Sequence, residues 1–299
     1  ALNTAFIQDG AFVHIPEGKR ILQPIHLLFL STAPGETTIS HPRNLIILDD
    51  NSQATILESY VGLSPRAYFT NSVTEIAVGE NANLDHYKLQ RESEEAFHIA
   101  TLQIHQGRSS KARAFDVTLG GVLTRNEVNG VLAGAGAECA LDGLYLVSGG
   151  QHVDNHTRID HAAPQTTSRE AFRGIIGERG RGVFNGKVVV HRGAEGTDAQ
   201  QSSDNLLLSE RGEIDTKPEL EIYTDAVKCA HGATVGELDP DQLFYMRSRG
   251  IDEGTAKGLL TFAFANDVLR RIELPEVRKR VASSVAGELP DYDSWGGLL

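Results

Sequence analysis

Residues 50–138 repeat one polar turn four times, as DNSQA at 50–54, GENAN at 79–83, GRSSK at 107–111 and GAGAE at 134–138. The turns begin 29, 28 and 27 residues apart, and each leads into an outgoing strand. A fixed period in this range is typical of stacked repeats, and short strands with Gly and Asn corners favour a β-solenoid. Evenly spaced turns also occur in β-sandwiches, so the pattern alone leaves both folds open.

Short strand-like segments fill the space between these turns. Residues 99–104 alternate in polarity, as expected of a half-buried strand, and no helical period of convincing length interrupts the chain from about residue 5 to residue 236. The other segments are 45–48, 54–57, 73–78, 84–89 and 114–119. The body of the chain is therefore predicted to be mainly β.

The pattern changes at Asp239. The segment Asp239-Pro240-Asp241-Gln242 is a capping box that opens a helix ending near Gly250. Two more helices are expected, one capped by Asp252 and ended by Pro275, and one after it. Their apolar positions are Ala256, Leu259, Leu260, Ala263, Phe264, Val268 and Ile272, then Val277, Val281 and Val285. We therefore divide the chain into a β-core at 1–238, a helical domain at 239–286 and a tail at 287–299 that we expect to be irregular.

Composition narrows the function classes. The formal net charge of −12 argues against nucleic-acid and anionic-membrane binding, because both need a basic surface. No apolar run is long enough to cross a bilayer. The two cysteines, Cys139 and Cys229, do not form a disulfide framework, and they fit a reducing cytosol. A strand-like pattern begins directly at Ala1, so we expect that an N-terminal part of a longer protein is missing.

Two stretches resemble the SufB/SufD family of iron–sulfur cluster assembly proteins. The first runs from Gln151 to Thr157, with Asp160-His161 and Ser168 after it. The second contains VFNGKVVV at 183–190, TDAQQSSDNLLLSE at 197–210, IDTKPELEIYTDAVKCAHGATVGELD at 214–239 and LFYMRSRGI at 243–251. The KPELEI and KCAHGAT segments are in the SufD style. One departure is Gly196, which stands where the family usually has Lys, so no role of that lysine carries over.

The resemblance implies a right-handed parallel β-helix followed by a small helical domain. It also implies a non-catalytic scaffold of the SufBCD complex, which pairs with a SufB-type subunit, docks the SufC-type ABC ATPase and has a role in iron delivery. No cofactor would be held permanently, and iron or a cluster would bind transiently at the SufB interface. Alone, the chain would form a homodimer through the C-terminal end of its β-helix, because a solenoid end exposes unpaired strand edges.

Cys229 and His231 are the candidate metal ligands. Side chains two positions apart share a face of a strand, and iron accepts both thiolate and imidazole. From spacing alone, a buried cysteine beside a hydrogen-bonded histidine is the more common arrangement. The resemblance places the pair at the contact with SufB, which favours a metal role for His231 and a weaker or structural one for Cys229.

A second histidine group, His152, His156 and His161, has no recognised metal-ligand spacing. His152 and His156 share a strand face and His161 does not, so a polar ladder between rungs is the main alternative to a metal site.

For the ATPase contact we single out residues of the helical domain, because arginine and aromatic side chains are favoured at interfaces. They are Leu243, Phe244, Tyr245, Arg247, Arg249 and Phe264.

Enzyme chemistry is not legible in the sequence. There is no G-x-S-x-G elbow, and the glycine-rich segment at 174–182 lacks the G-K-[ST] ending of a Walker loop. Two alternatives stay open: a SufB-like scaffold that carries the cluster itself, and a β-helix polysaccharide lyase or hydrolase, for which no paired carboxylates are evident.

Overall fold

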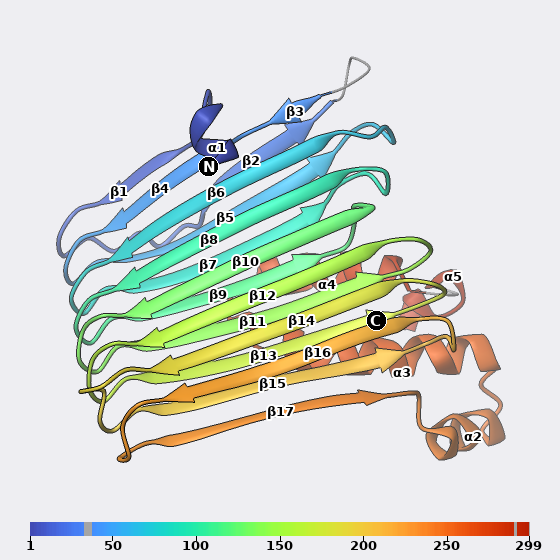
Figure 1. Ribbon diagram of the computed structural model, residues 1–299. Coiled ribbons are helices and arrows are strands. Elements are labelled where there is room, and N and C mark those ends of the chain that lie inside the picture. Colours follow the sequence, from blue (N-terminus) through green and yellow to red (C-terminus); the bar gives the residue numbers. More distant parts are fainter. Residues whose placement is uncertain (33–37, 290–291, 299) are drawn as a thin grey trace.

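The computed structural model describes residues 1–32, 38–289 and 292–298, and its strands form a parallel β-solenoid (Figure 1). Strands alternate between two sheets, so from β4 onward each strand pairs with the strand two positions later. All strand pairs among the described residues are parallel, which confirms the solenoid and excludes the β-sandwich.

Sheet A contains β1 (Phe12–Ile15), β3 (Ile39–Ser40), β4 (Arg43–Leu48), β6 (Phe69–Val78), β8 (Phe97–Gln106), β10 (Leu123–Leu132), β12 (His152–His161), β14 (Arg181–Val190) and β16 (Glu213–Ile222). Sheet B contains β2 (Ile25–Ser31), β5 (Gln53–Gly62), β7 (Asn83–Arg91), β9 (Lys111–Thr118), β11 (Glu138–Val147), β13 (Thr167–Ile176), β15 (Asp198–Leu207) and β17 (Lys228–Gly236).

One corner of the solenoid repeats the same backbone geometry in every rung, where the repeated turns had been identified. Seven corner residues have a left-handed backbone, with φ between +53° and +77°. Each donates its N–H to a carbonyl in the corner of the next rung, as from Asn51 to Glu80 at 2.7 Å. The seven are Gly18, Asn51, Asn81, Ser109, Gly136, Gln165 and Gly196. These bonds form a corner ladder that joins successive rungs outside the sheets.

The main core lies between the two sheets, where alternate side chains of every strand point inward. Ile46, Ile76, Ile104 and Ile159 from sheet A meet Ile56 and Leu84 from sheet B there, and all are buried. Each strand contributes one inward and one outward row, which explains the alternating polarity of the sequence.

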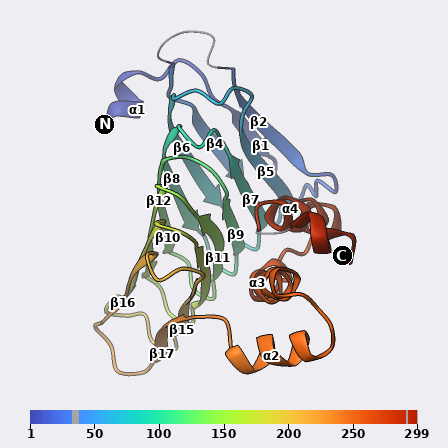
Figure 2. The same ribbon diagram turned by 90° about the vertical axis from the view of Figure 1, so that its right-hand side faces the viewer.

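Two C-terminal helices, α3 (Glu253–Leu269) and α4 (Pro275–Gly287), pack on the outer face of sheet B (Figure 2). α2 (Pro240–Ser248) and α5 (Tyr292–Trp295) contact α3, and a 3-10 turn η1 (Gly296–Leu298) follows α5. The short α1 (Leu2–Ala5) contacts β6 at the other end. Asp239 and Asp252 cap α2 and α3 as predicted, through bonds to Asp241 N and Thr255 N.

A second apolar core joins α3 and α4 to the solenoid. Outward side chains of sheet B, including Leu89, Phe115 and Leu144, are buried against the helices. The helical side of this core consists of Ala265, Val268, Leu269, Ile272, Val277, Val281 and Val285. Arg271 adds an ion pair to the buried Asp142 at 3.1 Å. The apolar period read from the sequence marks this face only in part. Val268 and Ile272 lie on it, whereas Ala263 is exposed and Leu259 packs against a separate cluster.

The expectation of an irregular tail at 287–299 is wrong for the residues that the structure describes, although 290, 291 and 299 lie outside them. α5 forms there, and Trp295 is fully buried in a small cluster with Ala286 and Leu289. A single large aromatic anchors this segment, and four helical residues are too few to show a period. None of the described helices has the length and apolar character needed to span a membrane.

Candidate functional site

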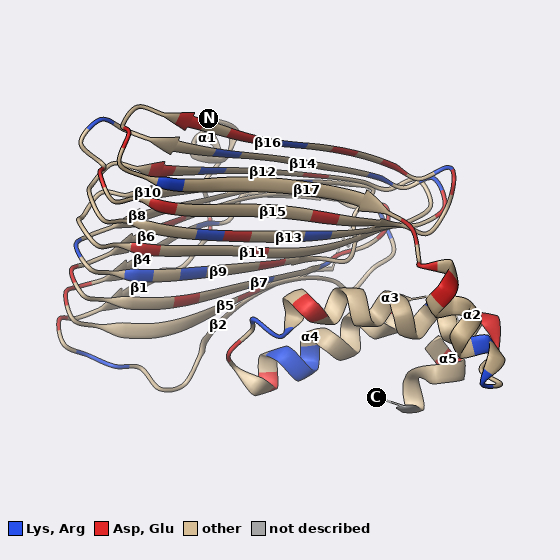
Figure 3. Ribbon diagram, turned by 90° about the horizontal axis from the view of Figure 1, so that it is seen from below, with Lys and Arg blue, Asp and Glu red and all other residues tan. Residues whose placement is uncertain are grey.

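The last rung, formed by β16 and β17, leaves one end of the solenoid open (Figure 3). Among the strands of the described residues, β16 pairs only with β14, and β17 only with β15. Inward positions of β15, such as Ala199 and Gln201, are buried, whereas their register partners on β17 are half-buried or exposed. The end therefore presents unpaired strand edges together with a row of inward-facing side chains that nothing in the described chain covers.

Cys229 and His231 belong to this inward-facing row, on the same face of β17 as predicted. Cys229 is half-buried against the core, in register with Ala199, and burial raises the pKa of its thiol, with Asp198 adding to the effect. His231 is exposed and in register with Gln201. Within the described residues, no group of three His, Cys, Asp or Glu side chains could hold a metal. The pair therefore offers an incomplete ligand set on the inward face of the last strand, where the open end of the solenoid leaves it accessible.

Two polar residues that sequence reasoning missed lie directly behind His231. Gln201 on β15 and Glu170 on β13 occupy the preceding rungs of the same column, and both are buried. Gln201 Nε2 donates to Glu170 Oε2 at 2.6 Å. Burial raises the pKa of Glu170 to about 7, although the Thr157 hydroxyl and the Gln201 amide act in the opposite direction. The signal for this column is the rung spacing, which places positions 170, 201 and 231 on one line.

The histidines of β12 are not brought together. His161 points into the core, where its ring nitrogens lie 2.7 Å from Thr166 Oγ1 and 2.9 Å from Ser168 Oγ. His156 faces outward and pairs with Asp154 at 2.9 Å. The structure thus separates His161 from His156, and the contacts of these two histidines lie within one rung rather than between rungs.

The predicted docking residues fall into two environments. α2 follows the open rung directly and has no buried residue, and Phe244 and Tyr245 are 73% and 59% exposed. Leu243 is half-buried, whereas Arg247 and Arg249 are exposed, with Arg249 over the Tyr245 ring. Phe264 differs, because it packs against the second core with the Arg173 guanidinium over its ring at 4.6 Å.

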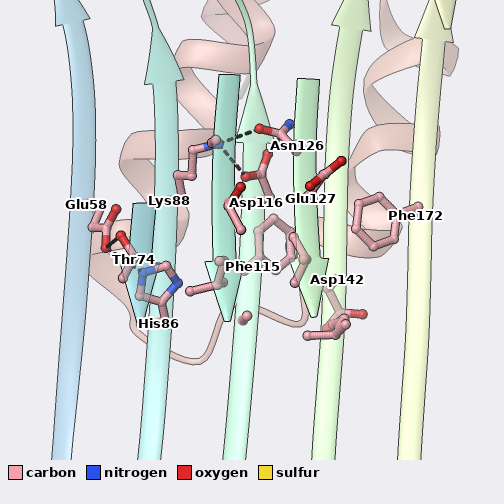
Figure 4. A pocket seen from close by; sticks show the side chains of 16 residues that line it. Glu58, Thr74, His86, Lys88, Phe115, Asp116, Asn126, Glu127, Asp142 and Phe172 are labelled. Atoms are coloured by element: carbon pink, nitrogen blue, oxygen red, sulfur yellow. Dashed lines mark hydrogen bonds and ion pairs between the residues drawn. The ribbon is translucent and has the colours of Figure 1, made fainter. Parts of the chain in front are cut away.

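Charged side chains also line the solenoid interior far from the open end, around a cavity of about 20 Å³ (Figure 4). Lys88 Nζ lies 3.0 Å from Asp116 Oδ2 and 2.6 Å from Asn126 Oδ1. Glu58 pairs with His86 at 3.1 Å, and both side chains are 2% exposed. Buried charges of this kind need partners, because each unpaired one carries a large desolvation penalty.

Comparison with known proteins gives a consistent family. Residues 29–264 match the model described as "SUF system FeS cluster assembly, SufBD core domain". The chain is 39% identical over 293 residues to an iron–sulfur cluster assembly SufBD family protein of Synechocystis sp., covering 95% of this chain and 65% of that protein. It is 32% identical over 291 residues to the iron–sulfur cluster assembly protein SufD of Escherichia coli, covering 97% and 69%. The chain spans about two thirds of the length of these relatives.

Proposed function

This chain belongs to the SufBD family of iron–sulfur cluster assembly proteins, and from that premise we propose that it is a non-catalytic, SufD-like scaffold subunit. It pairs with a SufB-type subunit through its open solenoid end and docks a SufC-type ATPase through α2. The observation that carries the proposal is the last rung, which presents unpaired strand edges and the exposed His231 and is followed directly by a helix with two exposed aromatic side chains. Two free cysteines suit the reducing cytosol in which we place it.

The open end would supply iron ligands only in part. The imidazole of His231 offers a nitrogen lone pair, whereas burial raises the pKa of the Cys229 thiol and so disfavours the thiolate that binds iron. The remaining ligands would come from the partner across the strand edges. Iron or a nascent cluster is cargo at this contact rather than a permanent cofactor.

A charge placed in the last rung should block self-association of the isolated chain, which we propose to be a homodimer through β16 and β17. Val235 is 48% exposed and points into the open end, so Val235→Asp would bury a charge against a second rung. Light scattering at micromolar concentration should give a dimer mass for the parent and a monomer mass for the variant. The matched control is Leu28→Asp, because Leu28 is 50% exposed on β2 at the opposite end of the solenoid. This variant should remain a dimer. A monomeric parent chain would contradict the proposal.

Loss of the exposed aromatics of α2 should weaken the ATPase contact without affecting the fold. Phe244→Ser together with Tyr245→Ser should lower affinity for the cognate SufC by roughly 30-fold or more, because buried aromatic anchors dominate interfaces. The melting temperature should hold, since α2 buries no residue. Phe12→Ser, which changes a 68% exposed aromatic on β1, is the matched control for titration calorimetry. Equal affinity for the α2 variant and the control would refute this docking site.

His231→Ala should reduce cluster formation in the assembled complex while leaving its composition and melting temperature unchanged. The side chain is exposed, so truncation removes a lone pair but little packing. Cys229→Ala should have a smaller effect, because the partner provides the main thiolates. Cluster yield is read from the absorbance of the reconstituted complex, with His105→Ala on the exposed face of β8 as the control. An unchanged yield in His231→Ala would remove this residue from the site.

A SufB-like role is the second candidate, and reconstitution of a stable cluster on the isolated chain would favour it. The polysaccharide lyase or hydrolase considered from the sequence gains no support from the family.

A further inference from the structure

Glu170, Gln201 and His231 form one inward-facing column across three successive rungs of sheet B. Glu170 on β13 pairs in register with Gln201 on β15, and Gln201 pairs with His231 on β17. Exposure changes sharply along the column, because Glu170 and Gln201 are each 4% exposed while His231 is open to solvent. The column therefore links the solenoid interior to the proposed metal ligand at the open end.

The direction of the Gln201 amide is fixed by its neighbours. Its Nε2 donates to Glu170 Oε2 at 2.6 Å, which leaves Oε1 as the free acceptor. Among the described residues, no group donates a hydrogen bond to the buried Gln201 Oε1. The amide fits because β14 has a glycine opposite, and a Cβ at Gly186 would lie 2.2 Å from Gln201 Nε2. A buried carbonyl oxygen without a partner is costly, so an N–H donor from the next rung would satisfy it.

We propose that Gln201 Oε1 accepts the N–H of the His231 imidazole, so that the other ring nitrogen presents its lone pair to a metal at the open end. Glu170 and Gln201 are then positioning residues, which act on the metal through His231. Ligating histidines are generally held in one tautomer by such an acceptor on the second nitrogen. The inference rests on the proposed metal role of His231 and adds the device that orients it.

Protonation of Glu170 reverses the arrangement. A carboxylate accepts from the Gln201 amide, whereas a carboxylic acid donates to Gln201 Oε1 and turns Nε2–H toward His231. The imidazole must then accept that bond with the lone pair that a metal needs. The groups facing Glu170 are Thr157 from β12, Gln201 from β15 and Cys139 from β11, while Gly186 on β14 brings no charge. Asp142 on β11 points outward to Arg271, and its charge reaches Glu170 only from across the strand. Because burial raises the pKa of Glu170 to about 7, the metal-ready arrangement is populated as pH rises through neutrality.

Nitrogen NMR of the histidine rings in the full chain without metal tests the coupling directly, with His231→Ala used to assign the signal. In the parent, His231 should hold one tautomer above neutral pH and change its tautomer populations near pH 7. Glu170→Gln, an isosteric change, should abolish that pH transition. Gln201→Met should give the mixed tautomers of a free imidazole. Gln106→Met removes another fully buried interior glutamine, bonded to Glu138 O instead, and should leave His231 unchanged.

A second arm measures Fe²⁺ binding anaerobically by titration calorimetry on the complex with SufB. Gln201→Met should lower affinity roughly 10- to 100-fold, as for other groups that orient metal ligands. Identical His231 tautomers in the parent, Gln201→Met and Glu170→Gln would overturn the inference. If the tautomers respond while His231→Ala leaves Fe²⁺ affinity unchanged, the positioning pair stands and the metal role of His231 fails. Melting curves identify variants that do not fold, and either of the two column variants suffices for the NMR test.

Discussion

Lys88→Met should lower the free energy of unfolding by about 3–5 kcal/mol, because it leaves the Asp116 carboxylate buried without its cation. The two side chains are 7% and 12% exposed, and Lys88 Nζ also holds Asn126 at 2.6 Å. Methionine keeps the length and apolar stem of lysine, so packing changes little and the loss measures the unpaired charge. Urea unfolding followed by circular dichroism gives the value.

Two further variants separate charge from packing at this position. Lys88→Met combined with Asp116→Asn should recover at least half of the loss, because the partner charge is removed as well. Lys111 on β9 of the same sheet pairs with Glu138 at 2.9 Å, and both side chains are about half exposed. Lys111→Met should therefore change the free energy of unfolding by less than about 1 kcal/mol. Equal losses for Lys88→Met and Lys111→Met would show that the interior pair contributes no more than a surface pair.

Removing residues 239–299 should leave a chain that does not fold into a stable, monodisperse species. α3 and α4 cover Leu89, Phe115, Leu144 and other outward side chains of sheet B, and deletion would expose this apolar face along several rungs. Expression followed by gel filtration and binding of a hydrophobic dye should show aggregation. ATPase docking therefore cannot be tested by removing the helical domain from the β-core, and point substitutions on α2 should be used instead.

A point variant of the full-length chain separates the effect of losing the contact between the helices and sheet B from the effect of deleting residues. Leu269→Asp places a charge in the fully buried contact between α3 and sheet B, and it should increase dye binding and lower the melting temperature by at least 10 °C. A soluble truncated chain with the melting temperature of the parent would show instead that sheet B is stable without its helices.

The sequence predicts the solenoid well because each rung has its own turn residues at the corner. Asn51, Asn81 and Ser109 stand at equivalent corners, and the turn spacing of 28 and 27 residues equals the register shift from Asn83 to Lys111 and from Lys111 to Glu138. The helix caps at Asp239 and Asp252 are local signals of the same kind. The surface on which α3 and α4 pack is not a local signal, since Val268 and Leu144 belong to one core although more than 100 residues separate them in the sequence.

The site is predictable only in part for the same reason. Cys229 and His231 share a face because they are two residues apart on one strand, which the sequence shows directly. Glu170 and Gln201 stand behind His231 only once the register of three rungs is known. Phe264 belongs to the apolar period of its helix and was also chosen as a docking residue, and the structure places it under the Arg173 guanidinium against sheet B. Hydrophobic periods of two or 3.6 residues show which side chains share a face of one strand or helix. Which residues of different rungs line up, and where a helix packs, depends on the whole fold.

The corner ladder has a consequence for how such a chain can change in evolution. Each corner in this ladder donates its bond to the next corner, from Gly18 through Gly196, so the backbone of a rung is joined there to that of its two neighbours. Duplication or loss of one rung moves the two ends of the molecule by about 4.8 Å, the spacing of adjacent strands, and leaves their surfaces unaltered. The distance between the open rung and the opposite end thus changes only by whole rungs, when one is duplicated or lost. An insertion of a few residues enlarges a corner instead.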